Sequence, residues 1–238
     1  MSENIVFSVI IPAYNEEKII ARCLQSVLDQ RTDFLFEVIV VNNNSTDKTG
    51  ELARNFLVKV IDESVPGVGS ARRTGTAAAV GKYILNIDAD TILPLDYLEQ
   101  AFKRFETDPK LVCLGGQIIF YDAPRHLQIT RAIGHRVLKW FAFLASRGRI
   151  GPMGSNMSFR RDAYLKTTGF DASLKFGEDG NLSQKLSYIG RVRLDLSLKA
   201  YVSSRRFRSK RGFFTYALNF IRLCFTGRPF KNELAEHR

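Results

Sequence analysis

The sequence predicts an α/β fold with a doubly wound, mixed but mostly parallel sheet flanked by helices. Short apolar runs alternate along the chain with stretches of helical periodicity, and the loops that join them are short. Polar residues directly follow several of the apolar runs, which is typical of parallel strands that present binding residues at one edge of a sheet. No linker or internal repeat interrupts this pattern, so we expect one domain over residues 1–238.

The expected elements follow one another in a regular order. Apolar runs predict strands at 6–11, 36–41, 58–61, 83–88, 111–121 and 154–160. Helical periodicity predicts helices at 16–28, 47–56, 70–80, 94–105, 127–145, 178–189 and 213–225. Local signals support several boundaries, because Gly81 can close one helix, Pro94 can open another, and Glu16 suits a first turn.

The composition is that of an ordinary globular protein, with 45% hydrophobic and 25% charged residues. Cys23, Cys113 and Cys224 are odd in number and far apart, so they indicate no disulfide framework or zinc site, which fits a reducing compartment. The first residues lack the pattern of a signal peptide, and no apolar run reaches the length of about 18 residues that a membrane span needs. We therefore expect a cytoplasmic protein.

The net charge of +11 is concentrated in the second half of the chain, which indicates an anionic partner. Two stretches there, 127–145 and 213–225, combine an apolar helical face with bordering arginines, and the segment 205–211 is strongly basic. This pattern is typical of helices at an anionic membrane surface, so we expect peripheral contact with the inner face of a membrane. The alternative is that both helices pack on the sheet or in a homodimer and leave the arginines solvated.

Asp88 and Asp90 stand where the buried strand that begins at Tyr83 ends. Two carboxylates one residue apart at such an edge can share a hard divalent cation with a diphosphate, because Mg²⁺ and Mn²⁺ take oxygen ligands from carboxylates, phosphates and water. The alternative is that both aspartates cap the helix that Pro94 opens. The two residues alone do not decide between these interpretations.

Six short motifs occur in a fixed order within residues 6–190. They are Pro12-Ala13-Tyr14-Asn15-Glu16, Val40-Val41-Asn42-Asn43-Asn44-Ser45-Thr46-Asp47, Gly69-Ser70-Ala71-Arg72-Arg73-Thr74-Gly75, Asp88-Ala89-Asp90, Gly154-Ser155-Asn156-Met157-Ser158-Phe159-Arg160 and Gly177-Glu178-Asp179. In this order they resemble family 2 glycosyltransferases, which are inverting enzymes of the GT-A fold, a nucleotide-diphospho-sugar transferase fold. The resemblance implies a nucleotide-sugar-binding half up to about residue 92 and an acceptor half after it.

The resemblance also assigns site residues. Those implied in binding the donor nucleotide and its sugar are Pro12, Ala13, Tyr14, Glu16, Asn42, Arg72, Asp88, Gly154 and Asn156. Asp90, with Asp88, would hold a Mn²⁺ or Mg²⁺ ion that offsets charge on the departing diphosphate. Asp179 would be the catalytic base, and Glu178 would contact the acceptor or hold the loop. The simpler interpretation of Glu178 and Asp179 is an acidic first turn of the following helix.

Several positions depart from the family pattern. The family usually has Asp at Asn42 and Gly at Asn44, and the lost charge puts a uracil base in doubt. An Asn carbonyl can still accept the uracil N3 hydrogen bond, so we expect UDP first and GDP second. Arg73 stands where Asn is common. No histidine stands in a motif that would supply a third metal ligand. Ser203-Ser204-Arg205-Arg206-Phe207 replaces the Gln-x-x-Arg-Trp motif of processive synthases, so we expect a single sugar transfer.

The predicted function is metal-assisted transfer of a sugar to an acceptor hydroxyl or a lipid-linked phosphate, as in the synthesis of cell-envelope polysaccharide or glycolipid. Two alternatives stay open: a catalytically impaired partner subunit, which Asn42 and Arg73 suggest, and a basic nucleic-acid-binding module, although we expect no nucleic acid partner. No glycine-rich loop follows the first strand, which argues against a dinucleotide dehydrogenase or a sugar-nucleotide pyrophosphorylase. The sugar, the acceptor and the formation of a homodimer are left open.

Overall fold

The computed structural model describes residues 4–123, 155–174 and 177–205, and it confirms the predicted α/β class. The strands are β1 (Phe7–Ala13), β2 (Phe36–Asn42), β3 (Lys59–Asp62), β4 (Tyr83–Asn86), β5 (Thr91–Ile92), β6 (Leu111–Phe120), β7 (Met157–Arg160) and β8 (Arg191–Val202). The helices are α1 (Ile20–Leu28), α2 (Thr49–Arg54), α3 (Val68–Ala77), α4 (Tyr97–Thr107), α6 (Arg161–Tyr164) and α7 (Glu178–Ser187).

The strands form one eight-stranded sheet in the order β3-β2-β1-β4-β7-β6-β8-β5. The first four strands of this order are parallel, with β1 between β2 and β4. In the second half, β7 runs antiparallel to β4 and β6, β8 runs parallel to β6, and β5 runs antiparallel to β8. The sheet is therefore mixed but mostly parallel, as the sequence predicts.

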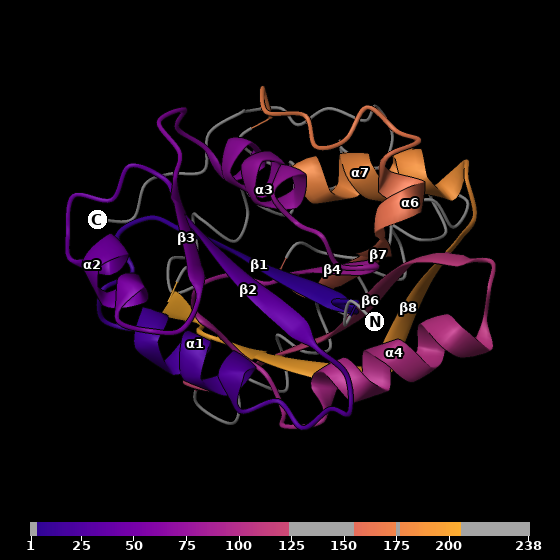
Figure 1. Cartoon of the computed structure of the whole chain (residues 1–238), viewed down its shortest axis with the longest axis horizontal. Helices are drawn as coiled ribbons and strands as arrows, with labels where there is room; N and C mark the ends of the chain where they lie inside the picture. Colours follow the sequence, from indigo (N-terminus) through magenta and orange to yellow (C-terminus); the bar gives the residue numbers. More distant parts are fainter. Residues whose placement is uncertain (1–3, 124–154, 175–176, 206–238) are drawn as a thin grey trace.

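Helices cover both faces of the sheet. Figure 1 shows α3, α6 and α7 on one side and α1, α2 and α4 on the other. Successive residues of a strand face opposite sides, so Val9 and Ile11 of β1 pack in the core that includes Leu24 of α1. Ile10 packs in the second core, which includes Leu182 of α7. Burial on both faces explains why these strands have continuous apolar sequences.

The carboxyl ends of the first three strands meet at one edge of the sheet. Ala13 at the end of β1 pairs with Asn42 at the end of β2, and Asn42 pairs with Asp62 at the end of β3. Strand β4 ends beside β1, and the chain then continues into Asp88 and Asp90. This edge therefore collects the polar residues that follow four neighbouring strands.

The first helix begins later than the sequence predicts. Regular helix starts at Ile20 rather than at Glu16, although the Glu16 carbonyl already accepts hydrogen bonds from Ile19 and Ile20. The Glu16 backbone N–H donates instead to the Thr49 hydroxyl at 2.7 Å, which fixes it to α2. The predicted helices at 127–145 and 213–225, and Gly154, lie outside the described residues.

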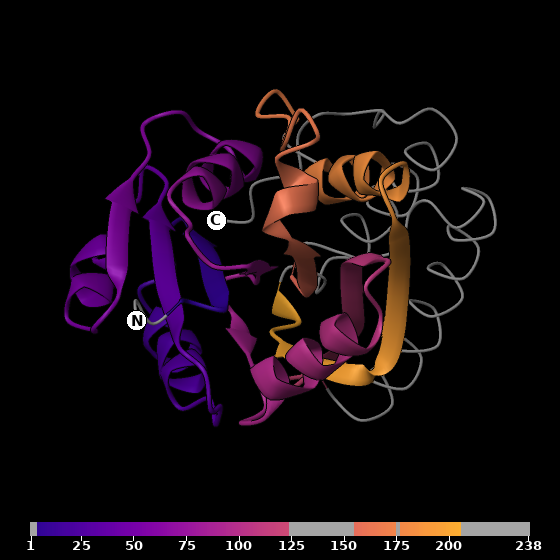
Figure 2. The same ribbon diagram turned by 45° about the vertical axis from the view of Figure 1, so that its right-hand side comes forward.

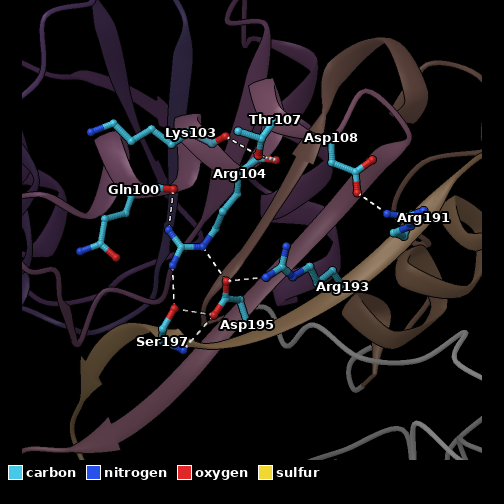
Figure 3. A network of polar contacts seen from close by, with 9 residues as sticks. All are labelled: Gln100, Lys103, Arg104, Thr107, Asp108, Arg191, Arg193, Asp195 and Ser197. Carbon is cyan, nitrogen blue, oxygen red and sulfur yellow. Dashed lines mark hydrogen bonds and ion pairs between the residues drawn. The ribbon is translucent and has the colours of Figure 1, made fainter.

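A polar network joins α4 to β8 where the pairing of β8 with β6 shifts register (Figure 3). Asp195 accepts a hydrogen bond from Arg104 Nε at 2.6 Å, and others from Arg193 and from the Ser197 backbone N–H at 3.2 and 2.9 Å. Figure 2 shows that β8 passes from the end of α7 across to α4. The network therefore holds the irregular part of this strand to the helix layer.

Candidate active site

Arg72 of α3 is a buried guanidinium that lies between two carboxylates from other elements. Its side chain donates to Asp88 Oδ1 at 2.9 Å and to Glu178 Oε1 at the start of α7. Arg72 is 3% exposed and Glu178 is 4% exposed. Gly75, on the same helix, makes the close approach of α3 to the sheet possible, because a Cβ there would lie 2.4 Å from Ile10 Cγ2. The ion pairs therefore connect α3, the end of β4 and α7.

Burial and ion pairing compete at both partners of this pair, with different outcomes. It disfavours the charged form of both groups. For Arg72, the attraction of Glu178 and Asp88 outweighs burial and raises the pKa of the guanidinium. For Glu178, burial outweighs the attraction of Arg72, and with repulsion from Asp179 it raises the pKa of the carboxyl to about 7. The arginine is thus permanently charged, whereas Glu178 titrates near neutral pH.

Asp88 and Asp90 follow β4, as predicted, and differ in exposure. Asp90 is 1% exposed, whereas Asp88 is partly exposed. The Cys23 thiol of α1 lies behind them and donates to the Asp88 carbonyl at 3.6 Å. Burial and the nearby charges of Asp90, Asp88 and Glu16 raise the pKa of Cys23, so it stays a neutral thiol. A neutral thiol therefore packs against the backbone that carries the two carboxylates.

The donor atoms at this edge suit a hard divalent cation. The carboxylates of Asp88 and Asp90 offer oxygen ligands of the kind that Mg²⁺ and Mn²⁺ prefer. Within the described ranges, no three histidine, cysteine, aspartate or glutamate side chains form a metal-binding group. The residues therefore fit a cation that takes its remaining ligands from phosphate and water.

Arg205, which follows β8, reaches the same edge from the far end of the described chain. It donates to Glu16 Oε2, and its Nε lies 3.5 Å from Asp90 Oδ2. The Glu16 and Asp90 side chains are 5% and 1% exposed, whereas that of Arg205 is 36% exposed. The sequence predicts Glu16 at the nucleoside and Arg205 in a basic segment, and the structure brings the two side chains into contact.

Asn42 lies beside a carboxylate that the sequence motifs do not reveal. Its Nδ2 donates to Asp62 Oδ1 at 2.8 Å, and the other Asp62 oxygen pairs with Arg54 at 2.5 Å. Asn42 Oδ1 is buried and has no hydrogen-bond partner among the described residues. A carboxylate on the neighbouring strand therefore lies next to Asn42, on a side chain that is 63% exposed and also paired with Arg54.

The turn after β1 and the turn after β2 are tied to each other. Asn15 Oδ1 accepts a hydrogen bond from the Thr46 backbone N–H at 2.8 Å, and the Ser45 hydroxyl accepts one from the Asn15 N–H at 3.2 Å. Asn44 takes the left-handed conformation, with a φ of 60°, as its place at a family glycine requires. Tyr14 is 53% exposed beside this pair of turns. The two turns therefore form a hydrogen-bonded corner at the end of β1, next to Pro12, Ala13 and Tyr14, whose contact with the donor stays a prediction.

Asp179 occupies the first turn of α7, directly after Glu178. Gly177 precedes them with a φ of 77°, a conformation that favours glycine and turns the chain sharply into the helix. Asp179 is partly exposed, whereas Glu178 is buried, so the two acidic residues differ in access to solvent. Asp179 is therefore the more accessible of the two carboxylates, while Glu178 faces Arg72.

Asn156 is predicted to line the donor sugar, but its side chain is almost completely buried. It is 1% exposed, its Oδ1 accepts a hydrogen bond from the Tyr97 hydroxyl, and its Nδ2 lies 3.4 Å from the Gln117 carbonyl. These contacts join α4 and β6 beneath the site. Its role toward the donor sugar stays a prediction.

Sequence analysis missed Asp62 and the role of Arg205. Asp62 ends a short strand without any motif, and only the pairing of β3 with β2 reveals its contact with Asn42. Arg205 is separated by 189 residues from Glu16, and its surroundings in the sequence are uniformly basic. Neither contact leaves a local signal, because both depend on the order of strands in the sheet.

The fold and this edge together define a glycosyltransferase of the GT-A type, in which the ends of parallel strands and the neighbouring helices bring acidic residues and an arginine to one site. The chain belongs to glycosyl transferase family 2, whose family profile matches residues 8–167. The resemblance drawn from the motifs is thereby confirmed.

Relatives and solved structures agree with this assignment. The glycosyltransferase GlyA of Streptococcus pneumoniae is 26% identical over 219 residues, which cover 82% of this chain and 30% of that protein. Chondroitin synthase of Escherichia coli is 30% identical over 191 residues, which cover 77% of this chain and 26% of the synthase. The chain thus spans less than a third of the length of these relatives.

The mannosyltransferase PcManGT of Pyrobaculum calidifontis, solved with GDP-Man and Mn²⁺, shares the fold. Its TM-score is 0.72 at 22% identity, over 93% of this chain and 63% of that one. TarS of S. aureus, solved with UDP-GlcNAc, has a TM-score of 0.67 at 20% identity, over 96% of this chain and 68% of that one.

Proposed function

We propose that this glycosyltransferase inverts the anomeric centre as it moves one sugar from a nucleotide-diphosphate sugar to an acceptor hydroxyl or a lipid-linked phosphate, assisted by a divalent cation. The observation that carries the proposal is the convergence of Asp88, Asp90, Arg72 and Asp179 at the carboxyl edge of parallel strands. A diphosphate bound at this edge would meet a fixed guanidinium, two carboxylates for a cation, and a carboxylate base.

The chemistry requires a base behind the anomeric carbon, and we assign this role to Asp179. As the acceptor oxygen forms its bond to the anomeric carbon, the bond to the diphosphate breaks and the nucleoside diphosphate leaves with the electron pair. The proton of the acceptor hydroxyl passes to the Asp179 carboxylate. An ionised lipid phosphate would need no such transfer, so the dependence on Asp179 distinguishes the two acceptor classes.

Arg72 would stabilise the negative charge that develops on the diphosphate. Its contacts with Asp88 and Glu178 fix the orientation of the guanidinium before any substrate binds, so little reorganisation is needed during the reaction. A cation bound by Asp88 and Asp90 would add Lewis-acid stabilisation of the same leaving group. The Mn²⁺ in the structure of PcManGT supports a divalent metal, although that protein shares only the fold with this one.

The nucleobase of the donor, uracil or guanine, would be selected by Asn42 and Asp62. The solved neighbours were obtained with UDP-GlcNAc in one case and GDP-Man in another, so the fold accommodates both bases. We keep UDP as the first expectation, because the buried Oδ1 of Asn42 can accept one hydrogen bond from a uracil N3–H. The exposed Asp62 carboxylate supports GDP as the second, since guanine offers two adjacent donors.

The acceptor and the cellular site are proposed on the charge of the chain. In the part of the chain that the structure describes, no helix is both long and apolar enough to cross a bilayer. The net charge of +11 supports peripheral contact with an anionic membrane, where a lipid-linked acceptor would be found. The two amphipathic stretches that led to this proposal lie outside the described residues.

Thermal melting with UDP-sugars and GDP-sugars, with and without Mn²⁺, tests the proposal. A nucleotide at about 100 times its Kd should stabilise the native state by about 2.7 kcal/mol and raise the melting temperature by several degrees. Asp90→Asn should lose the metal-dependent part of the shift, whereas Asp96→Asn, at an exposed aspartate before α4, should keep it. If no nucleotide shifts the wild-type protein, the proposal fails and a catalytically impaired partner subunit becomes the better hypothesis.

A further inference from the structure

Arg205 covers two buried carboxylates that belong to the proposed metal and donor site. Its guanidinium bonds to Glu16 and lies 3.5 Å from Asp90 Oδ2. The carboxylates are almost inaccessible, at 5% and 1% exposed, whereas the Arg205 side chain is 36% exposed. Arg205 is therefore the solvent-facing member of this group, and the two carboxylates lie beneath it.

A guanidinium and a divalent cation are competitors for the same carboxylate. Each binds carboxylate oxygens, and a divalent cation at Asp90 would repel the positive guanidinium that lies 3.5 Å from Oδ2. Asp90 is held on the short connection between β4 and β5, so its carboxylate has little freedom to move. Arg205 has a long, partly exposed side chain, so Arg205 is the partner that can move.

We propose that Arg205 is the resting counter-ion of the metal position. It holds Glu16 and Asp90 while the donor is absent, and it leaves Asp90 when a metal–nucleotide complex binds, to contact the incoming diphosphate. This inference rests on the proposed function, because it takes Asp90 as a metal ligand. One consequence is that the cation alone binds weakly. Another is that the cation and the nucleoside diphosphate bind cooperatively, since the diphosphate gives the displaced guanidinium a new anion.

The affinity for Mn²⁺ tests this inference without any assay of activity. The free ion can be counted by its electron paramagnetic resonance signal in titrations of wild type and Arg205→Gln, first without and then with UDP or GDP. Arg205→Gln should bind Mn²⁺ alone about tenfold more tightly, the effect of removing one contacting cation from a carboxylate. The nucleotide should then improve Mn²⁺ binding less in the variant than in wild type.

Arg191→Gln is the matched control. Arg191 begins β8, at the opposite end of the strand from Arg205, and its Nη1 also forms an ion pair, at 2.6 Å from Asp108 Oδ2. The substitution removes the same charge and a comparable contact from the surface, so the Kd for Mn²⁺ should stay at the wild-type value. If Arg191→Gln tightens binding as much as Arg205→Gln does, the effect is one of net charge and the inference fails.

Two further variants separate the possible failures. If Asp90→Asn binds Mn²⁺ as tightly as wild type, the metal site of the proposed function is wrong. If Asp90→Asn abolishes binding while Arg205→Gln shows the wild-type Kd or a weaker one, only the inference about Arg205 is overturned. Arg205→Met serves if the glutamine variant does not fold, because methionine removes the charge and keeps a long, flexible side chain. It should bind Mn²⁺ more tightly than wild type, and an unchanged Kd would again reject the inference.

Discussion

The molecule contains two networks of arginine and carboxylate side chains that differ in the balance of charge. Between α4 and β8, Arg104 and Arg193 share the single carboxylate of Asp195 (Figure 3). At the carboxyl edge of the sheet the proportion is reversed. There, Arg72 faces Asp88 and Glu178, and Arg205 faces Glu16 and Asp90.

The carboxyl pKa values differ between the arginine-rich network and the carboxylate-rich one. Partial burial disfavours the charge on Asp195, yet hydrogen bonds from Ser197 and Arg104 lower the pKa of its carboxyl to about 2. At the site, burial raises the pKa of Glu178 to about 7 in spite of Arg72. The first network fully pairs its one carboxylate and links α4 to β8. The second holds more negative charge than it neutralises, which is the condition expected of a site that binds cations.

The largest effect is expected from Asp179→Asn. Loss of the proposed base should lower kcat by about 10²–10⁴-fold with a hydroxyl acceptor. The nucleotide-induced melting shift should be unchanged, because the donor is bound elsewhere on the edge. Asp162→Asn is the control, since Asp162 lies in the first turn of α6 and its Oδ1 accepts a hydrogen bond from the next backbone N–H at 2.8 Å, as that of Asp179 does at 2.7 Å. Full activity of Asp179→Asn would remove this residue from the mechanism.

Arg72→Met should be the most destabilising change in either network. It leaves two carboxylates without their buried partner, which typically costs about 3–5 kcal/mol in the free energy of unfolding. Arg104→Met removes hydrogen bonds to one carboxylate nearer the surface and should cost about 2 kcal/mol. Urea denaturation of both variants gives the comparison. Equal losses would mean that the balance of charge in the two networks does not matter for stability.

Glu178→Gln should remove a pH dependence of stability. Because the native pKa of Glu178 is raised to about 7, its contribution is fully present below about pH 4.5 and is lost as the pH rises through 7. The wild-type free energy of unfolding should therefore fall by about 3 kcal/mol from this group over that interval. In Glu178→Gln this fall should be absent. A variant that keeps the wild-type slope would show that another group titrates there.

Asp195→Asn should show the opposite sign at lower pH. The native pKa is depressed to about 2, so the contribution of Asp195 is present above about pH 4 and is lost as the pH falls through 2. Near neutral pH the variant should be less stable by about 2 kcal/mol, and its unfolding should respond less to acid between pH 4 and pH 2. Identical acid unfolding of variant and wild type would contradict the account of this network.

The regular elements could be predicted because their signals are local. The buried strands are continuous apolar runs, and the glycine and proline residues mark boundaries close to those observed. The start of α1 was the main error, since the acidic residue that suits a helix start by its sequence is held by α2 and by Arg205. A long-range contact overrode a local preference at Glu16.

The site was predicted unevenly, for a similar reason. Five site residues stand in recognisable motifs, and the structure brings all of them to one edge of the sheet: Arg72, Asp88, Asp90, Glu178 and Asp179. Their pairing could not be predicted, because Arg72 and Glu178 are 106 residues apart. Only the order of strands and helices determines which carboxylate each arginine faces.

The contact between Arg205 and Glu16 also has a consequence for biosynthesis. Since 189 residues separate the two, a ribosome that adds about 5–20 residues per second exposes Glu16 roughly 10–40 s before Arg205. Once Asp90 has been added, the nascent chain contains the strands β1, β2 and β4, but Glu16 and Asp90 still lack this guanidinium partner. The first half of the sheet is therefore translated early, while the charges at its edge are balanced only near the end of translation.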